Sequence, residues 1–464
     1  MKTTLLAVLS IVLLLLSCRK DSFITSPDAS VTITADTLHY DTVFTTIGSV
    51  TQTFKIVNEN NKKIKLSSVK LMGGSASNFR INVDGAATTE ASNVEISAND
   101  SVHVFVQVNV DPAAGNLPFI IRDSIQVAYN GKTKWVQLEA WGQNAHFLRN
   151  REIISDETWQ NDLPYVIQGY LFVDANQTLN IEKGCRIYVH ADAPLVIDGT
   201  MKVNGEKDTA DRVYFQGDRL DEPYSEYPAA WPGIFFRGTS KDNVLNYAVI
   251  RNSYQSIAAE GPSPNASPKI ILNQCVIDNS YDAGIIALNS SIVVNNSLIS
   301  NCGKNIAVGK GGDYAFNHCT IVSYSNAFIQ HKDPVVNLSN TDGTATAPLT
   351  AIFRNCIIWG DDGSDDNKLV GNEIVVTKSA TDNVVFDHNL WRVNTPPANV
   401  TSNDIINGQA PVFDSINVTK RYYNFRLQSI SPAIDKGIAG SLTIDLDGLP
   451  RPVGQPDLGC FEKQ

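Results

Sequence analysis

The amino-acid sequence predicts an all-β protein, with an N-terminal β-sandwich followed by a solenoid of stacked coils. The main observation is a five-residue sequence motif, called the repeated phrase below, that occurs six times between residues 246 and 391. Each copy has a small residue in the middle. The numbers of those middle residues differ by 27, 22, 22, 37 and 33. Repeats of roughly 20 to 30 residues are typical of solenoids. The middle residues are Ala248, Cys275, Ser297, Cys319, Cys356 and Asn389.

The N-terminus has the pattern of a secretory signal peptide, residues 1–17. Lys2 supplies the positive charge, and Leu5 to Leu16 form a largely apolar run of twelve residues, which is too short to cross a bilayer. The sequence Leu15-Leu16-Ser17-Cys18 resembles the lipobox of bacterial lipoproteins. This resemblance implies that Cys18 is lipidated, that residues 18–27 link the anchor to the first domain, and that the membrane is a partner through the lipid.

The stretch Arg19-Lys20-Asp21-Ser22 loosely resembles the export tags of Bacteroidetes surface lipoproteins. We therefore expect a cell-envelope protein that is lipid-anchored in the outer membrane, and the sequence leaves open whether it faces the periplasm or the cell surface. Removal of residues 1–17 leaves 36 basic and 48 acidic residues, a net charge of −12. Such a balance argues against nucleic acid as a partner.

Six cysteines remain after Cys18, and no two of them form a Cys-x-x-Cys pair. Cys275, Cys319 and Cys356 share the middle position of the repeated phrase. A column of small buried side chains explains that coincidence better than disulfides or a metal site does.

Residues 28–145 predict a β-sandwich of the immunoglobulin-like type, because seven short alternating or β-branched runs occur in some 115 residues. Turn signals such as Asn130-Gly131 separate the runs. The segments Asp41–Gly48, Thr53–Asn60 and Phe79–Asn82 resemble the Ig-like modules that follow the lipid anchor in many Bacteroidetes surface proteins. The resemblance implies a non-catalytic spacer.

The solenoid is predicted over residues 165–410, preceded by a linker and N-terminal cap at 146–164. Strands of three to five residues alternate with turns at Gly184, Gly199 and Gly205, as expected at the corners of a coil. The segments Gly169–Val173, Asp198–Gly205 and Trp231–Phe236 resemble the opening coils of right-handed parallel β-helix proteins of the pectate-lyase-like superfamily.

Residues 411–464 are expected to cap the open end of the coil. The segments Ser431–Gly437, Asp445–Arg451 and Asp457–Glu462 resemble the C-terminal ending of bacterial surface proteins of the β-helix or choice-of-anchor type. A cap would keep the last strands from pairing with another chain.

A polar row precedes the small residues of the repeat, and simple alternation would place it outside the coil. Such a row could hydrogen-bond sugar hydroxyls, or it could merely solvate a strand face. Apolar residues such as Val249 and Val276 would share that outward side, so either a loop covers them or the parity is reversed. The row is Tyr247, Gln274, Asn296, His318, Asn355 and His388.

A second candidate is the insertion at 218–231, where carboxylates lie beside aromatic residues. Sugar stacking or glycoside hydrolysis requires this combination, although an exposed acidic loop also accounts for it. The candidate ligand-binding residues of the insertion are Asp221, Glu222, Tyr224, Tyr227 and Trp231, and those of the polar row are His318 and His388.

No metal or cofactor is predicted. Asp361, Asp362, Asp365 and Asp366 could supply oxygen ligands for Ca²⁺, but they lack the ordered spacing of an EF-hand and fit a solvated charge run. The sequence shows no Ser-His-Asp order, phosphate loop or zinc motif, so no catalytic residue is assigned.

The predicted function is therefore a lipid-anchored envelope protein whose β-helix binds glycan or another surface ligand without catalysis. Two alternatives stay open: a polysaccharide lyase or glycoside hydrolase of the cell envelope, and a structural or adhesion protein.

Overall fold

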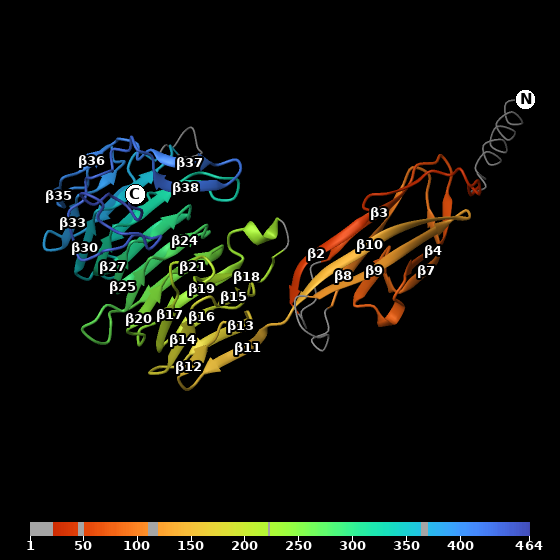
Figure 1. Cartoon of the computed structure of the whole chain (residues 1–464), viewed down its shortest axis with the longest axis horizontal. Helices are drawn as coiled ribbons and strands as arrows, with labels where there is room; N and C mark the ends of the chain where they lie inside the picture. Colours follow the sequence, from red (N-terminus) through yellow and green to blue (C-terminus); the bar gives the residue numbers. More distant parts are fainter. Residues whose placement is uncertain (1–21, 45–50, 110–118, 221–222, 363–369) are drawn as a thin grey trace, which may run out of the picture. The chain divides into compact units, whose positions relative to one another are not determined.

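We describe the protein from a computed structural model, in which residues 22–44, 51–109, 119–220, 223–362 and 370–464 are placed (Figure 1). The chain divides into two compact units, Met1–Asn144 and Ala145–Gln464, and each has its own hydrophobic core. The only helices in these ranges are two 3-10 turns, and nothing helical there has the length and apolar character of a membrane span. The predicted all-β fold class is confirmed.

The first unit is a β-sandwich of two five-stranded sheets, ordered β1-β3-β8-β5-β6 and β2-β10-β9-β4-β7 in the bounds given below. Alternate side chains point inward, and Val102, Val104 and Val106 show this along one strand. The predicted N-terminal sandwich is confirmed. Its strands are β1 (Val31–Ile33), β2 (Thr37–Phe44), β3 (Gln52–Asn58), β4 (Ile64–Leu71), β5 (Phe79–Val83), β6 (Ala86–Thr88), β7 (Glu90–Ile96), β8 (Ser101–Val108), β9 (Phe119–Tyr129) and β10 (Lys132–Gln143), with the 3-10 turn η1 (Gly74–Ala76).

The second unit is a parallel β-solenoid built on one 26-stranded sheet, in which strands two or three places apart in the chain pair in parallel and form three faces. Face 1 contains β15 (Arg186–Val189), β18 (Val213–Gly217), β21 (Ala248–Arg251), β24 (Val276–Asp278), β26 (Leu298–Ser300), β28 (Thr320–Ser323), β31 (Ile357–Gly360), β34 (Leu390–Trp391) and β36 (Ile406–Asn407). Face 2 contains β16 (Leu195–Ile197), β19 (Trp231–Phe236), β22 (Ser253–Glu260), β29 (Val336–Ser339) and β32 (Ile374–Thr377).

Face 3 completes each coil. It contains β12 (Glu157–Trp159), β14 (Thr178–Glu182), β17 (Thr200–Asn204), β20 (Asn243–Asn246), β23 (Ile270–Asn273), β30 (Leu349–Arg354), β33 (Asn383–Asp387) and β35 (Thr401–Asn403). Four long strands bend through two faces: β11 (His146–Ile153), β13 (Tyr165–Val173), β25 (Ala283–Asn295) and β27 (Lys304–Asn317). Figure 1 shows these strands stacked in order along the unit.

The solenoid begins earlier than the sequence predicts. We expected a linker and cap at 146–164, yet β11 pairs in parallel with β13, and β12 pairs in parallel with β14. His146 lies directly opposite Tyr165, the expected first residue of the coil. Residues 146–164 are thus the first coil itself, because they alternate and pair like the coils that follow.

The interior of the coil is filled by columns of like side chains, one from each coil. Phe316, Phe353 and Phe386 stack with ring centroids 4.6 and 5.0 Å apart. Cys275, Cys319 and Cys356 are free and fully buried, as the predicted packing column requires. Burial raises the pKa of the Cys275 thiol to about 12, so the thiol stays protonated and inert at neutral pH.

The repeated phrase spans a turn between two strands and is not one strand. Its second residue has a left-handed backbone at every repeat, with φ between 46° and 57°. The residue before it ends a face 3 strand, and the small residue after it turns back into the core. Asparagine tolerates this conformation best among residues with a Cβ, which explains Asn296 and Asn355. The other residues at this position are Tyr247, Gln274, His318 and His388.

Residues 411–464 cover the outside of face 1 along its length, whereas we expected them to cap the end of the coil. Their hairpin strands β37 (Phe413–Asn417) and β38 (Tyr422–Leu427) pair only with each other. Phe425, Leu458 and Phe461 pack on the outward residues of face 1 in one apolar cluster. The covered outward residues include Val249, Val276, Val322, Ile357 and Leu390. Of the two alternatives, a covering loop or a reversed parity, the structure shows the first, and the cover comes from the C-terminal segment.

Candidate functional site

A row of asparagines lies at the turn from face 1 to face 2 in three consecutive coils. Asn252, Asn279 and Asn301 follow β21, β24 and β26, and all three have left-handed backbones with φ of 60°, 57° and 52°. Asn279 Nδ2 donates to Asn252 Oδ1 at 2.8 Å, so consecutive coils are linked through their amides. The short polar side chain of asparagine tolerates the left-handed turn, and stacking of the coils places the three amides in line.

The described residues 223–230 of the insertion lie over this row. The 3-10 turn η2 (Tyr224–Glu226) carries two backbone carbonyls that accept hydrogen bonds from the row. Asn252 Nδ2 donates to the Ser225 carbonyl at 2.8 Å, and Asn279 Nδ2 donates to the Glu226 carbonyl at 3.0 Å. The insertion is therefore held at a defined place by two asparagines that lie on consecutive coils.

The C-terminal hairpin closes the site from the other side. Arg421 donates to the Glu226 carbonyl at 3.0 Å and to Glu226 Oε2 at 3.2 Å. Its guanidinium also lies 4.5 Å from the ring centroid of Phe328. This cation–π contact and the ion pair tie three segments that are far apart in the sequence.

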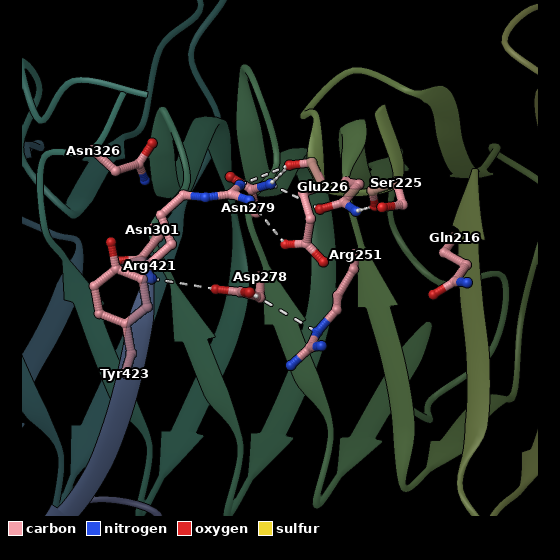
Figure 2. A pocket seen from close by; sticks show the side chains of 11 residues that line it. Gln216, Ser225, Glu226, Arg251, Asp278, Asn279, Asn301, Asn326, Arg421 and Tyr423 are labelled. Carbon is pink, nitrogen blue, oxygen red and sulfur yellow. Dashed lines mark hydrogen bonds and ion pairs between the residues drawn. The ribbon is translucent and has the colours of Figure 1, made fainter. Parts of the chain in front are cut away.

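These segments enclose a small pocket of about 80 Å³, which we call the asparagine pocket (Figure 2). All its side chains are polar, and its charges balance, with two arginines and two carboxylates. Ser300 Oγ donates to Asp278 Oδ1 at 2.6 Å, and Arg251 Nε lies 3.9 Å from Asp278 Oδ2. The pocket is lined by Gln216, Ser225, Glu226, Arg251, Asn252, Asp278, Asn279, Asn301, Asn326, Arg421 and Tyr423.

Aromatic rings flank the pocket. Tyr227 lies between Tyr224 and Phe328, with ring centroids 5.2 and 4.8 Å away. Arg219 covers the ring of Tyr224 at 3.4 Å. Burial, with the nearby charge of Asp278, raises the pKa of Tyr423, so this hydroxyl is a neutral hydrogen-bonding group at physiological pH.

Of the predicted ligand-binding residues, Tyr224 and Tyr227 lie at this site beside the pocket, Tyr224 in η2 and Tyr227 directly after it. Trp231 does not, because it begins β19 and its indole is 1% exposed in the coil core. Its ring N–H donates to the Arg251 carbonyl at 2.8 Å, which satisfies the buried donor. Asp221, Glu222 and the predicted lipidation site Cys18 lie outside the described residues.

The two predicted histidines lie elsewhere, in the turn between face 3 and face 1. His318 is 4% exposed, and its Nε2 accepts a hydrogen bond of 2.8 Å from Asn355 Nδ2. The His388 side chain is 19% exposed, with Nδ1 2.8 Å from Asp387 Oδ1. The polar row to which they belong is largely covered by the C-terminal segment, as the bond from Asn296 Nδ2 to the Ile444 carbonyl shows. His318 is therefore not available to a surface ligand.

The acidic residues at 361–366, which the sequence favours as a solvated charge run over a Ca²⁺ site, make ion pairs where they are described. Asp361 Oδ1 lies 3.0 Å from His331 Nδ1, and Asp362 pairs with Arg392. Within the part of the chain that the structure describes, no cluster of three His, Cys, Asp or Glu side chains could hold a metal ion. Asp365 and Asp366 lie outside that part.

The sequence patterns considered above do not predict the asparagine row. Its signal is the tripeptide Asn-Ser-Tyr, which occurs at 252–254 and again at 279–281, at the step of 27 residues that separates the first two phrases. Asn301 continues the row one coil later. Arg421 and Tyr423 gave no local signal, because only the fold brings the C-terminal hairpin to this turn.

No protein-family model and no curated protein matches the sequence. Similar solved structures include a family 123 glycoside hydrolase from Clostridium perfringens (14% identity, TM-score 0.18, 24% of this chain and 26% of that one). Another is the alkylpurine DNA glycosylase AlkC of Pseudomonas fluorescens (11% identity, TM-score 0.17, 25% and 31%). A third is the catalytic domain of a GH87 alpha-1,3-glucanase (10% identity, TM-score 0.20, 76% and 80%).

The chain spans less than a third of the length of the first two structures. All three TM-scores are too low to carry an argument about activity. The functional argument therefore rests on the geometry of the asparagine pocket.

Proposed function

We propose that this protein binds glycan at the asparagine pocket without catalysis, as a cell-envelope protein anchored to the membrane through Cys18. The observation that carries the proposal is the pocket lining, in which side-chain amides and charge-balanced ion pairs lie beside aromatic rings. Amides and carboxylates offer both donors and acceptors to hydroxyl groups, and aromatic faces accept the apolar side of a ring. A sugar presents both kinds of surface.

The arrangement of carboxylates favours binding over hydrolysis. Hydrolysis of a glycoside needs one carboxyl group that gives up a proton and a second that acts as base or nucleophile. The pocket has two carboxylates, and both are engaged: Glu226 is bound by Arg421, and Asp278 is held by Ser300 and Arg251. Neither is arranged as a free proton donor.

The test is retention of the mature protein on a panel of immobilised polysaccharides, with and without Ca²⁺, while released sugars are measured. We expect retention, no new reducing ends or unsaturated products, and no effect of Ca²⁺. Arg421→Gln should weaken retention, because it releases Glu226 and loosens the insertion over the pocket. The neighbouring Lys420→Gln is the matched control, since Lys420 is exposed and does not line the pocket.

Released products would overturn the non-catalytic proposal in favour of a lyase or hydrolase. Failure of every polysaccharide to retain the protein would overturn glycan binding and favour a structural or adhesion role.

A further inference from the structure

The corner beside the asparagine pocket carries two exposed tyrosines on consecutive coils. Tyr254 and Tyr281 each stand two residues after an asparagine of the row, Asn252 and Asn279. Their side chains are exposed, at 46% and 53%, and their rings stack with centroids 5.9 Å apart and an angle of 28°. Exposed stacked aromatics are a surface that a stable fold does not itself require.

The turn beneath the tyrosines is rigid. Ser253, Ser256 and Ser280 are fully buried and hydrogen-bonded to one another, at 2.6 to 3.2 Å. The backbone N–H of Tyr281 donates to the Ser253 carbonyl at 2.9 Å, which ties the two coils together at this corner. The rings are thus presented from a fixed support, which lowers the entropy cost of binding.

The third coil interrupts the aromatic column. The residue two places after Asn301 is Gly303. A Cβ at this position would lie 2.3 Å from the Tyr281 carbonyl oxygen, so no side chain fits there. The coil that follows Tyr281 therefore adds no side chain to the column at position 303, and Tyr281 is 53% exposed.

The polar groups next to this gap are charge-balanced. Lys304 Nζ lies 3.4 Å from Asp282 Oδ1, and Gln255 Nε2 donates to Asp282 Oδ2 at 2.6 Å. An ion pair and an amide can hydrogen-bond hydroxyl groups without attracting a net charge. The protein as a whole carries a net charge of −11, which disfavours polyanions.

We infer that the face of Tyr281 above Gly303 is a stacking subsite for one ring of a neutral glycan, whose neighbouring unit binds in the asparagine pocket. This inference rests on the proposed function and extends it by one subsite and by the class of ligand. One sugar ring would occupy the position that the missing third aromatic leaves, with its apolar face on Tyr281 and its hydroxyls beside Asp282 and Lys304.

The test uses the full mature protein and three neutral polysaccharides, a β-glucan, an α-glucan and a mannan, with polygalacturonate as the acidic probe. Affinity is measured by electrophoresis in gels that contain the polysaccharide. Tyr281→Ala should weaken binding of the retained neutral polysaccharide roughly tenfold, as expected for the loss of one stacking contact. Tyr281→Phe should bind like the wild type, because it keeps the ring face.

Trp135→Ala is the matched control, since Trp135 is an exposed aromatic of the sandwich, at 43% against 53% for Tyr281. Thermal unfolding of each variant verifies that it is folded. We expect the Tyr281 variants to fold, because the Tyr281 side chain is exposed. Wild-type affinity in Tyr281→Ala, together with weakened binding in Arg421→Gln, would overturn the subsite and leave the proposed function standing. Preference for polygalacturonate would overturn the neutral class, and no binding to any polysaccharide would overturn both proposals.

Discussion

Two buried histidines give the solenoid opposite responses to pH. His318 lies in the turn that the C-terminal segment covers, and burial, with the positive charge of Arg451, lowers its pKa to about 3. His331 lies in a later insertion, and its ring is held between two carboxylates, with Nδ1 3.0 Å from Asp361 and Nε2 3.0 Å from Glu373. One imidazole is therefore kept neutral and the other is kept charged.

For His318, the unfolded chain binds a proton below pH about 6.5 and the folded chain does not, so stability is lost as the pH falls. The loss should reach about 2 kcal/mol at pH 5. His318→Asn should flatten the stability profile between pH 6.5 and 4, because asparagine occupies the same left-handed position at 296 and 355. Urea unfolding across this pH range measures the effect. An unchanged acid limb in the variant would contradict the assignment.

For His331 the direction is reversed. Burial by itself lowers its pKa, but the hydrogen bonds to Asp361 and Glu373 outweigh burial and raise the pKa to about 9. The folded chain therefore holds a proton that the unfolded chain loses above pH about 6.5. The contribution of charged His331 to the free energy of unfolding is complete below pH about 6.5 and is lost as the pH rises through about 9. The total loss is roughly 3 kcal/mol.

Replacement of His331 by glutamine should remove this alkaline decline. It should also lower stability at pH 6, because Glu373 is fully buried and would lose the nearer of its two charged partners, which leaves only Arg392 at 3.9 Å. Urea unfolding at pH 6 and pH 9.5 gives both quantities. The prediction fails if wild type and variant lose the same stability between these two values.

At the scale of elements, the C-terminal segment forms a second apolar core with the outward side of face 1, separate from the core inside the coil. Its apolar side chains cover the outward side of face 1, and Arg451 connects it to the turns through Asn296 Oδ1 at 2.7 Å. Arg451 also pairs with Glu462 at 2.8 Å, and both side chains are almost completely buried. The ion pair joins two residues of the segment itself, and the hydrogen bond to Asn296 is the contact by which Arg451 holds the segment against the coil.

Leu458→Ala should therefore destabilise the solenoid by about 3 kcal/mol, as a large-to-small change in a packed core does. Leu458 is 1% exposed in the cluster over face 1. Val418→Ala in the hairpin turn is the control, at 39% exposure, and should change stability by less than about 0.5 kcal/mol. Equal effects of the two changes would show that the segment does not pack as described.

Among the elements, the sequence predicted the coil and its small-residue column but misplaced what surrounds them. The sequence places Trp231 both at the end of an acidic aromatic insertion and at the start of a coil segment, and the structure confirms only the coil segment, because Trp231 begins β19 and points into the core. His318 was assigned to an outward strand position, although it occupies a left-handed turn. The alternation of inward and outward side chains holds only within a strand. A left-handed residue between two strands breaks the alternation, so the side-chain directions of one strand do not predict those of the next.

At the scale of the whole molecule, the sandwich and the solenoid have separate cores and should unfold separately. Calorimetry of the mature chain should show at least two transitions. Phe79→Ala in the sandwich should lower only one of them, and Phe353→Ala in the solenoid only the other, by about 3 to 5 kcal/mol each. Both rings are fully buried, so the pair is matched. A single transition that both changes shift together would contradict independent folding.

The sequence by itself determined the all-β class, the division into sandwich and solenoid, and the buried cysteine column, because these follow from local alternation and from a repeat of fixed composition. Tertiary structure alone decided which side of the coil is covered and where a ligand could bind. The contact from Asn296 to Ile444 joins residues 148 positions apart, and the ion pair of Glu226 with Arg421 joins residues 195 apart. Local patterns carry no information about such distant partners, so the pocket becomes visible only when the C-terminal segment lies against the coil.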